Sequence, residues 1–182
     1  IIKRAEKIRP LQVGKIAPDL AMIKATDRDK IAQMGFEDVK TSDELTKLFY
    51  SKQKELNNMY LKMNSIQAKY LIVAFWDVDC SHCQVEIPKL IEVYNELKKE
   101  KKNVKVYSVY TLHEGEKYLK YIAEKGLTDW INVYDGAYNN NVVDKYEVRT
   151  TPVIYILDEN KVIKVKKIPV DKIKTFLLDL EK

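Results

Sequence analysis

Residues 75–88 read FWDVDCSHCQVEIP and hold the only two cysteines of the chain, Cys80 and Cys83, in a Cys-x-x-Cys spacing. The apolar run 70–76 leads into this stretch, and residues 87–97 continue it with apolar side chains at helical spacing. We therefore expect both thiols where a buried strand turns into a helix, a context that gives this spacing a redox meaning.

The 182 residues fit one domain, which would bury roughly 70% of its unfolded surface and needs no disulfide staple. The formal net charge of +5 comes from 32 basic and 27 acidic residues that are spread along the chain, so the composition argues against a nucleic-acid site. No stretch approaches the roughly 20 apolar residues of a membrane span. Because the chain begins with Ile1, we expect a processed or partial form whose signal or anchor lies outside it.

Hydrophobic periodicity and turn signals divide the chain into alternating strands and helices. A capping box of Thr41 and Glu44 opens the helix before the cysteines. Strands are expected at 20–25, 69–76, 104–110, 130–134, 153–157 and 162–168, with another near 36–39; helices at 42–64, 81–101, 114–125 and 171–182; a helical turn at 139–146; and a hairpin turn at 158–161.

This order predicts an α/β fold with a mixed central sheet flanked by helices. Strands joined by helices should pair in parallel through right-handed crossovers, and the final hairpin should add an antiparallel edge. We expect an N-terminal arm at 1–19 and one domain at 20–182, with an inserted region at about 28–68 that carries the extra helix.

The two thiols should differ because they occupy different positions in the first helical turn. Residues three apart there are close enough for a disulfide to open and close with little backbone movement. Cys80 lies at or before the helix N-terminus, where free N–H groups and the helix dipole stabilise a thiolate. Cys83 lies one turn inside and should be more buried. Cys80 is therefore expected to attack a substrate disulfide, and Cys83 to resolve the mixed disulfide.

Three neighbours should influence the Cys80 thiolate. His82, if protonated or donating to sulfur, would stabilise it and make the couple more oxidising. Asp77 and Asp79 would disfavour it, because a nearby carboxylate opposes a second negative charge. The sequence does not decide between these effects.

Glu86 stands three residues beyond Cys83 on the same helix face and could carry its proton during exchange. The alternative is an exposed glutamate on the helix surface. Thr151 and Pro152 precede a buried strand and could lie beside the thiols, and an X–Pro bond at such a place could be cis.

Together these motifs resemble the TlpA/ResA-like thiol–disulfide oxidoreductases of the thioredoxin superfamily. The resemblance covers about 14–182. The residues that carry it are Ala17-Pro18-Asp19-Leu20, Ala74-Phe75-Trp76, Cys80-Ser81-His82-Cys83 with Glu86 and Pro88, Tyr146-Glu147-Val148, Thr150-Thr151-Pro152 and Tyr155-Ile156-Leu157-Asp158.

The resemblance implies a thioredoxin-like fold in which Pro152 is the cis-proline that faces the disulfide. Thr151 would then offer backbone hydrogen bonds to a substrate, Glu86 would be the active-site glutamate, and Pro88 would kink the helix. Trp76, Asp79, Ser81 and His82 complete the residues expected to bind substrate or tune the thiols.

The chain also departs from the family pattern. Asp79 stands where many members carry Trp, and Ala74 stands where cytosolic thioredoxins carry a buried aspartate, so proton handling should rest more on Glu86. The long stretch 28–68 with its extra helix, combined with the Asp-x-Asp at Asp77 and Asp79 before the cysteines, resembles envelope redox proteins of Gram-negative bacteria.

The leading hypothesis is a reductase of protein disulfides in the periplasm or cell envelope. It would act as a monomer, receive electrons from an upstream donor, use no cofactor beyond the Cys80/Cys83 couple, hold no metal, and be anchored, if at all, through a segment outside this chain. The histidine between the cysteines keeps an isomerase or oxidant role open.

Other functional classes are weaker. A peroxiredoxin would carry Thr or Ser at the position of Asp77, although Arg149 could mimic its peroxide-site arginine. Copper or zinc binding would need Cys80, Cys83 and a histidine, and His113 is the only histidine besides His82. A non-catalytic binding module is the remaining alternative.

Overall fold

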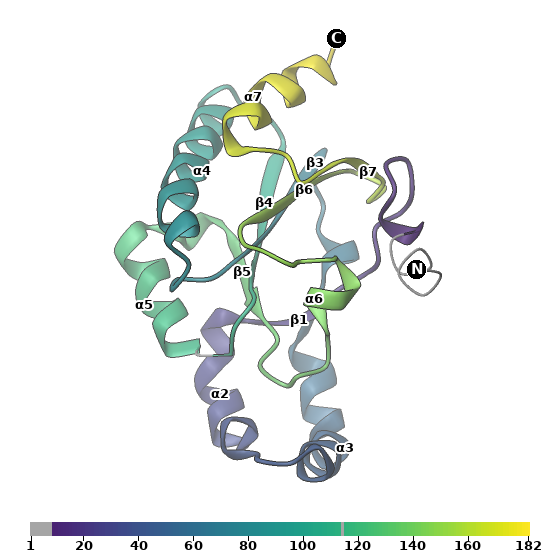
Figure 1. The fold of residues 1–182 in the computed structure, drawn as a ribbon, viewed down its shortest axis with the longest axis vertical. Helices are drawn as coiled ribbons and strands as arrows, with labels where there is room; N and C mark the ends of the chain where they lie inside the picture. Colours follow the sequence, from purple (N-terminus) through teal and green to yellow (C-terminus); the bar gives the residue numbers. More distant parts are fainter. Residues whose placement is uncertain (1–8, 114) are drawn as a thin grey trace.

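The computed structural model describes residues 9–113 and 115–182, which form a mixed sheet with helices on its faces and at one end (Figure 1). The strand order is β2-β1-β5-β4-β3-β6-β7. The strands are β1 (Ala21–Lys24), β2 (Tyr60–Lys62), β3 (Tyr70–Trp76), β4 (Val104–Tyr110), β5 (Ile131–Tyr134), β6 (Val153–Asp158) and β7 (Ile163–Lys166). The helices are α2 (Arg28–Gln33), α3 (Ser42–Met59), α4 (Ser81–Lys99), α5 (Gly115–Lys125), α6 (Val142–Lys145) and α7 (Val170–Asp179).

Three central strands, β3, β4 and β5, pair in parallel, and the β6–β7 hairpin joins β3 in antiparallel fashion. The expected mixed sheet is therefore confirmed. The first strand differs from the expectation of parallel pairing, because β1 lies antiparallel to both β5 and β2. The crossover rule applies to strands joined directly by a helix, whereas the connection from β1 to β3 contains a strand of its own, β2.

Both faces of the sheet are buried, as the continuous apolar run of β3 predicts. Alternate side chains of β3 point to opposite faces. Ile72, Ala74 and Trp76 join the core that contains α4, α5 and α7. Leu71, Val73 and Phe75 join a second core on the opposite face, which includes Val142 of α6.

The helix expected at 42–64 begins as predicted but ends early. Its capping box is confirmed, since Glu44 N donates to Thr41 Oγ1 at 3.3 Å and Thr41 N donates to Glu44 Oε2 at 3.2 Å. The prediction for its last turn is wrong, because Tyr60–Lys62 leaves the helix and pairs with β1 as an edge strand. The helical spacing of apolar residues continues through Tyr60 and Met63, so periodicity alone could not show the change.

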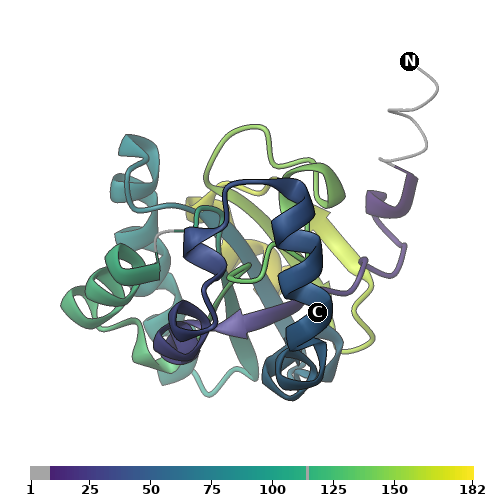
Figure 2. The same ribbon diagram turned by 90° about the horizontal axis from the view of Figure 1, so that it is seen from below.

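The strand expected near 36–39 is also wrong. Gly35 has φ +85°, a left-handed conformation that suits glycine, and it leads into a 3₁₀ turn at Phe36–Asp38. Phe36 is buried in this turn. Seen from below, α2 and α3 lie side by side at the end of the sheet, on either side of this turn (Figure 2).

The other expected elements are confirmed within a few residues. Gly126 ends α5 in the left-handed conformation that a C-cap requires, with φ +67°. Glu114, the expected first residue of that helix, lies outside the described residues. Pro88 lies inside α4, where it has no N–H to donate to the carbonyl of Gln84.

The described part of the N-terminal arm packs on the β7 edge. Gly14 N donates to Ile163 O at 2.8 Å, Ile16 forms a bridge with Val162, and Leu11 is buried. Residues 1–8 of the expected arm lie outside the described residues, and the division into arm and domain stays a prediction. Of the helices described, none is long and apolar enough to cross a membrane.

One buried hydrogen-bond network joins the strand before the cysteines to its parallel neighbour. Trp76 Nε1 donates to Ser108 Oγ at 2.8 Å, and Ser108 Oγ lies 3.0 Å from the hydroxyl of Tyr118. All three side chains are fully buried. The network therefore fixes the end of β3 against β4 and α5.

Replacing Ser108 by Ala should destabilise the fold by about 1–3 kcal/mol, because the Trp76 N–H loses its acceptor without access to water. Urea unfolding measures this change. Ser51→Ala, at an exposed position of α3, serves as a control and should stay within about 0.5 kcal/mol of the wild type. Equal stability of the Ser108 variant and the wild type would contradict the prediction.

Candidate active site

Strand register brings the two halves of the site together. Because β6 runs antiparallel to β3, with Val153 opposite Phe75, the residues before β6 lie beside the loop that follows β3. That loop leads to Cys80, the N-cap residue of α4. The segment before β6 contains Thr151 and Pro152, and the peptide bond between them is cis. The pairing thus places two segments about 70 residues apart in one site.

The cysteines are close and both are free thiols. Their sulfur atoms lie within 4.8 Å of each other. Cys80 Sγ accepts a hydrogen bond from Cys83 N at 3.3 Å, and its thiol donates to the carbonyl oxygen of Thr151 at 3.3 Å. Cys80 is half-buried, whereas Cys83 is 1% exposed. A substrate can therefore reach only the first sulfur directly.

The surroundings favour ionisation of Cys80. Burial opposes its thiolate, but hydrogen bonds to its sulfur outweigh burial and hold the pKa of Cys80 below its ordinary value. The donors come from Thr151, the Cys83 thiol and the backbone N–H groups of Cys83 and His82. The Thr151 hydroxyl also lies 2.9 Å from Asp77 Oδ2, and the backbone N–H groups belong to the helix N-terminus, a position that favours a thiolate.

Cys83 has the opposite environment. Burial raises its pKa to about 12, and a hydrogen bond and the charge of Cys80 act in the same direction. The backbone N–H of Asp77 and the Thr151 side chain offset only part of this effect. The inequality expected from the helix positions is therefore present in the structure, with the same order of the two thiols.

Asp77, which the sequence places as a charge near the Cys80 thiolate, makes a contact with Thr151 that the sequence analysis did not predict. One of its carboxylate oxygens lies within 4.8 Å of both sulfur atoms. Oδ2 accepts from the Thr151 hydroxyl, and Oδ1 accepts from Asp79 N at 3.1 Å. Its place three residues before Cys80 was visible in the sequence, but its contact with Thr151 depends on the pairing of β3 with β6.

Asp79, Ser81 and His82 are exposed around the opening of the site. Asp79 pairs with Lys117 of α5 at 2.9 Å, which offsets its expected repulsion of the thiolate. His82 contributes its backbone N–H to the Cys80 sulfur. Stabilisation of the thiolate by the imidazole itself stays a prediction.

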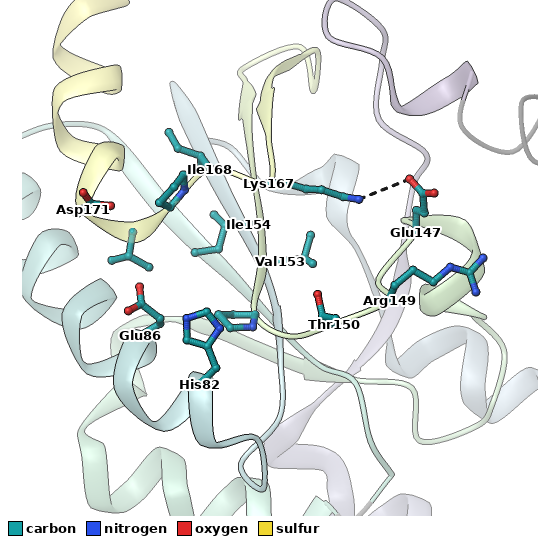
Figure 3. Close-up of a pocket in the computed structure, with 13 residues that line it drawn as sticks. His82, Glu86, Glu147, Arg149, Thr150, Val153, Ile154, Lys167, Ile168 and Asp171 are labelled. Atoms are coloured by element: carbon teal, nitrogen blue, oxygen red, sulfur yellow. Dashed lines mark ion pairs between the residues drawn. The ribbon is translucent and has the colours of Figure 1, made fainter.

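Glu86 lines a cavity of about 410 Å³ together with His82 and Pro152. Its side chain is 17% exposed and pairs with Lys89 at 2.7 Å, so it is not a freely solvated surface glutamate. Glu86 and His82 lie at one end of the cavity, and the ion pair of Lys167 with Glu147, at 3.6 Å, lies at the other (Figure 3). Pro152, Val153, Ile154 and Ile168 add apolar lining, and none of the lining residues comes from α3.

Trp76 is fully buried and bonded to Ser108, with its ring 5.1 Å from that of Tyr121. Direct contact between Trp76 and a substrate is ruled out by this burial. Tuning of the site through packing is the part of its expected role that stays a prediction.

The described residues around the thiols do not include the histidine ligand that the copper or zinc alternative needs. Among the described residues, the group with closely spaced ligand atoms consists of Asp77, Cys80 and Cys83 and contains no histidine. The ring of His113 instead stacks on Tyr138, with ring centres 4.0 Å apart. Two cysteines with a histidine, the set that the metal alternative requires, are therefore not brought together.

The peroxiredoxin alternative gains no support from the geometry either. Asp77 occupies the position of the hydroxyl residue that such a site would use. Arg149 is 59% exposed and lies 3.8 Å from Asp144. Its charge is directed to a surface carboxylate, as expected for a loop arginine.

Comparison with known proteins gives consistent matches. Residues 67–163 match a family model described as thioredoxin-like. No curated protein sequence matches the chain. A domain of a possible thiol-disulfide isomerase from Cytophaga hutchinsonii is 31% identical, with a TM-score of 0.71 over 94% of this chain and 95% of that one.

Two further solved structures share the fold at lower identity. The thioredoxin domain of a thiol-disulfide oxidoreductase from Bacteroides vulgatus is 22% identical, with a TM-score of 0.66 over 94% of this chain and 99% of that one. A thiol:disulfide interchange protein from Bacteroides sp. is 21% identical, with a TM-score of 0.63 over 92% of this chain and 89% of that one. The expected α/β fold with a thioredoxin-like arrangement is thereby confirmed.

The two thiols should react at very different rates with iodoacetamide. In the reduced protein at pH 7, Cys80 should be alkylated at least about ten times faster than Cys83, since the thiolate is the nucleophile. The pH midpoint for Cys80 should lie below that of free cysteine, about 8.5. Peptide mass spectrometry measures both rates.

Unfolded protein is the control for this experiment, because burial and the helix N-terminus no longer distinguish the thiols there. The two alkylation rates should then become similar. Faster alkylation of Cys83 in the folded protein would contradict the described environments.

Proposed function

Because the chain belongs to the thioredoxin-like family, we propose that it reduces protein disulfides through a Cys80/Cys83 dithiol–disulfide couple. The observation that carries this proposal is the pair of unequal free thiols. The accessible thiol has a lowered pKa, the buried thiol has a raised pKa, and their sulfurs lie within 4.8 Å. Such a pair suits an attack by one sulfur followed by resolution by the other.

In the first step, the Cys80 thiolate attacks one sulfur of a substrate disulfide. A bond forms between Cys80 and that sulfur, and the other substrate sulfur leaves as a thiolate that takes a proton from solvent. Backbone N–H groups at the start of α4 hold the attacking thiolate before the reaction. The exposed side of Cys80 is the side on which a substrate must approach.

In the second step, Cys83 loses its proton and its sulfur attacks Cys80. The bond between Cys80 and the substrate breaks, the second substrate sulfur leaves, and a Cys80–Cys83 disulfide remains. The substrate gains two electrons and the protein loses two. The sulfurs are already adjacent, so this step requires only a small movement of the first helical turn.

The cavity lined by His82, Glu86 and Pro152 is the proposed place for the substrate chain. Its apolar lining near Pro152 would contact side chains next to the substrate disulfide, and its charged ends would favour a polypeptide over a small apolar disulfide. Glu86 and His82 are proposed to contact the substrate or carry protons at this opening. Both line the same cavity as Pro152, which supports the assignment.

The proposed setting is the periplasm or cell envelope, where protein disulfides form and need reduction or repair. Support comes from the resemblance of residues 28–68 and of the Asp-x-Asp before the cysteines to envelope redox proteins. In this setting the protein would act as a monomer and receive electrons from an upstream dithiol donor.

The protein should accelerate the reduction of insulin by dithiothreitol. Cys80→Ser should lower the rate to that of dithiothreitol alone, because the attacking sulfur is absent. Cys83→Ser should instead accumulate a mixed disulfide with insulin, since the resolving sulfur is absent. Turbidity and non-reducing gels measure these outcomes.

Ser51→Ala, remote from the thiols on α3, is the control for insulin reduction and should match the wild type. Absence of any acceleration by the wild-type protein would refute the proposed activity.

The equilibrium potential of the couple should lie nearer the thioredoxin value of about −270 mV than the value of about −120 mV found in a strong oxidant. Strong oxidants stabilise the reduced form through a highly favoured thiolate. Here hydrogen bonds lower the pKa of Cys80, but burial and the Asp77 carboxylate within 4.8 Å of its sulfur limit how far the thiolate is favoured. Titration against glutathione or dithiothreitol buffers measures the potential, and a value near −120 mV would favour the oxidant alternative.

A further inference from the structure

The inference concerns the proton of Cys83 and rests on the proposed thiol–disulfide chemistry. The resolving sulfur is 1% exposed and cannot lose its proton directly to bulk water. Some group of the protein must therefore accept it. Position 74, where cytosolic thioredoxins carry a buried aspartate, is an alanine in this chain.

Among the described residues, Asp77 best meets the requirements for a proton acceptor of Cys83. Its carboxylate oxygen lies within 4.8 Å of Cys83 Sγ, a separation that one bridging water can span. Its backbone N–H also reaches the Cys83 sulfur. Glu86, by contrast, is paired with Lys89 at 2.7 Å and lines the cavity that also contains His82 and Pro152.

Thr151 connects this carboxylate to the attacking thiol. Its hydroxyl donates to Asp77 Oδ2 at 2.9 Å, while its carbonyl oxygen accepts from Cys80 Sγ at 3.3 Å. The second carboxylate oxygen accepts from Asp79 N. These two donors fix the orientation of a side chain that lies at the exit of β3.

We propose that Asp77 is the general base that removes the proton of Cys83 when the mixed disulfide is resolved. The thiol proton passes to the Asp77 carboxylate, directly or through one water, and the Cys83 sulfur attacks Cys80. The bond from Cys80 to the substrate breaks, and the departing substrate thiolate takes up a proton. The carboxylic acid then returns its proton to solvent, so that protons and electrons balance.

The state of Cys80 makes this transfer easier at the step where it is needed. When both cysteines are reduced, the negative charge of the Cys80 thiolate and the hydrogen bond between the two cysteine side chains help to keep Cys83 protonated. In the mixed disulfide Cys80 carries no charge, so that contribution disappears. Asp77 remains beside Cys83 in both states because Thr151 and the Asp79 backbone hold it.

Other titratable groups face the thiols and must be separated from Asp77 in any test. Asp79 lies on the same loop and is paired with Lys117 of α5. His82 and Glu86 lie on α4. Tyr121 of α5 lies near Cys83. Burial raises the pKa of this tyrosine, and the negative charge of a Cys83 thiolate raises it further.

The test uses 5,5′-dithiobis(2-nitrobenzoate), which releases one coloured thiolate when Cys80 attacks and a second when Cys83 resolves the adduct. Asp77→Asn should slow the second release by about 10- to 100-fold at pH 7. The first release should not slow, because the substitution removes a negative charge beside the attacking thiolate. Stopped-flow absorbance resolves the two phases, and Cys83→Ser, which lacks the second, assigns them.

The pH profile separates a general base from a structural role. The wild-type second phase should lose rate as acid protonates the base, and this acid limb should be absent in Asp77→Asn. Glu92→Gln, an exposed carboxylate of α4, is the matched control and should behave like the wild type. An unchanged second phase in Asp77→Asn, or equal slowing of both phases, would overturn the proposal.

Two further variants keep the result decisive. If Asp77→Asn fails to fold, Thr151→Val removes the donor that orients the carboxylate and should slow the second phase several-fold, and no slowing would overturn the proposal. Loss of the acid limb in Glu86→Gln instead would assign the base to Glu86. The wild-type protein could release the coloured thiolate in both phases and still fail to reduce insulin. That result would refute protein disulfides as the substrate class, but it would not affect the role of Asp77.

Discussion

The antiparallel pairing of β6 with β3 is the constraint on which the site depends. With Val153 opposite Phe75, the segment that contains Thr151 and Pro152 must lie beside the turn from β3 into α4. Thr151 then contacts Cys80 through its carbonyl oxygen and Asp77 through its hydroxyl. A shift in this register would displace Thr151 from the turn between β3 and α4 and so break its contacts with Cys80 and Asp77. The chemistry of the thiols is therefore set by a strand that begins about 70 residues after them.

Burial and helix position act on the two thiols in opposite directions. Cys80, as N-cap residue, receives side-chain and backbone hydrogen bonds that together outweigh its partial burial, whereas Cys83, one turn later, has burial as its dominant influence. This difference follows from spacing alone, so it could be predicted from the sequence. The effect of the nearby charges could not, because Lys117, which offsets Asp79, comes from α5 and its contact depends on how that helix packs.

The sequence predicted the strands and helices that carry strong periodicity or a capping signal, and it predicted the Cys-x-x-Cys turn and the Thr151–Pro152 segment of the site. It failed at Tyr60–Lys62, where the apolar spacing of a helix continues into a strand and only pairing with β1 distinguishes the two. It also failed near Phe36, where a single buried aromatic residue in a turn imitates a strand. Both errors lie in the inserted region, whose structure depends on long-range contacts.

Asp77 shows the same limit within the site. From the sequence it is only a charge near a cysteine, and Glu86 is the better candidate for proton transfer because it shares a helix face with Cys83. The structure gives Glu86 a lysine partner and a place in the lining of a cavity, and it gives Asp77 a fixed position beside both sulfurs. A residue in a loop acquires its chemistry from the elements on either side of the loop. Here those elements are β3, which ends the buried run, and β6, whose pairing supplies the hydroxyl that orients the carboxylate.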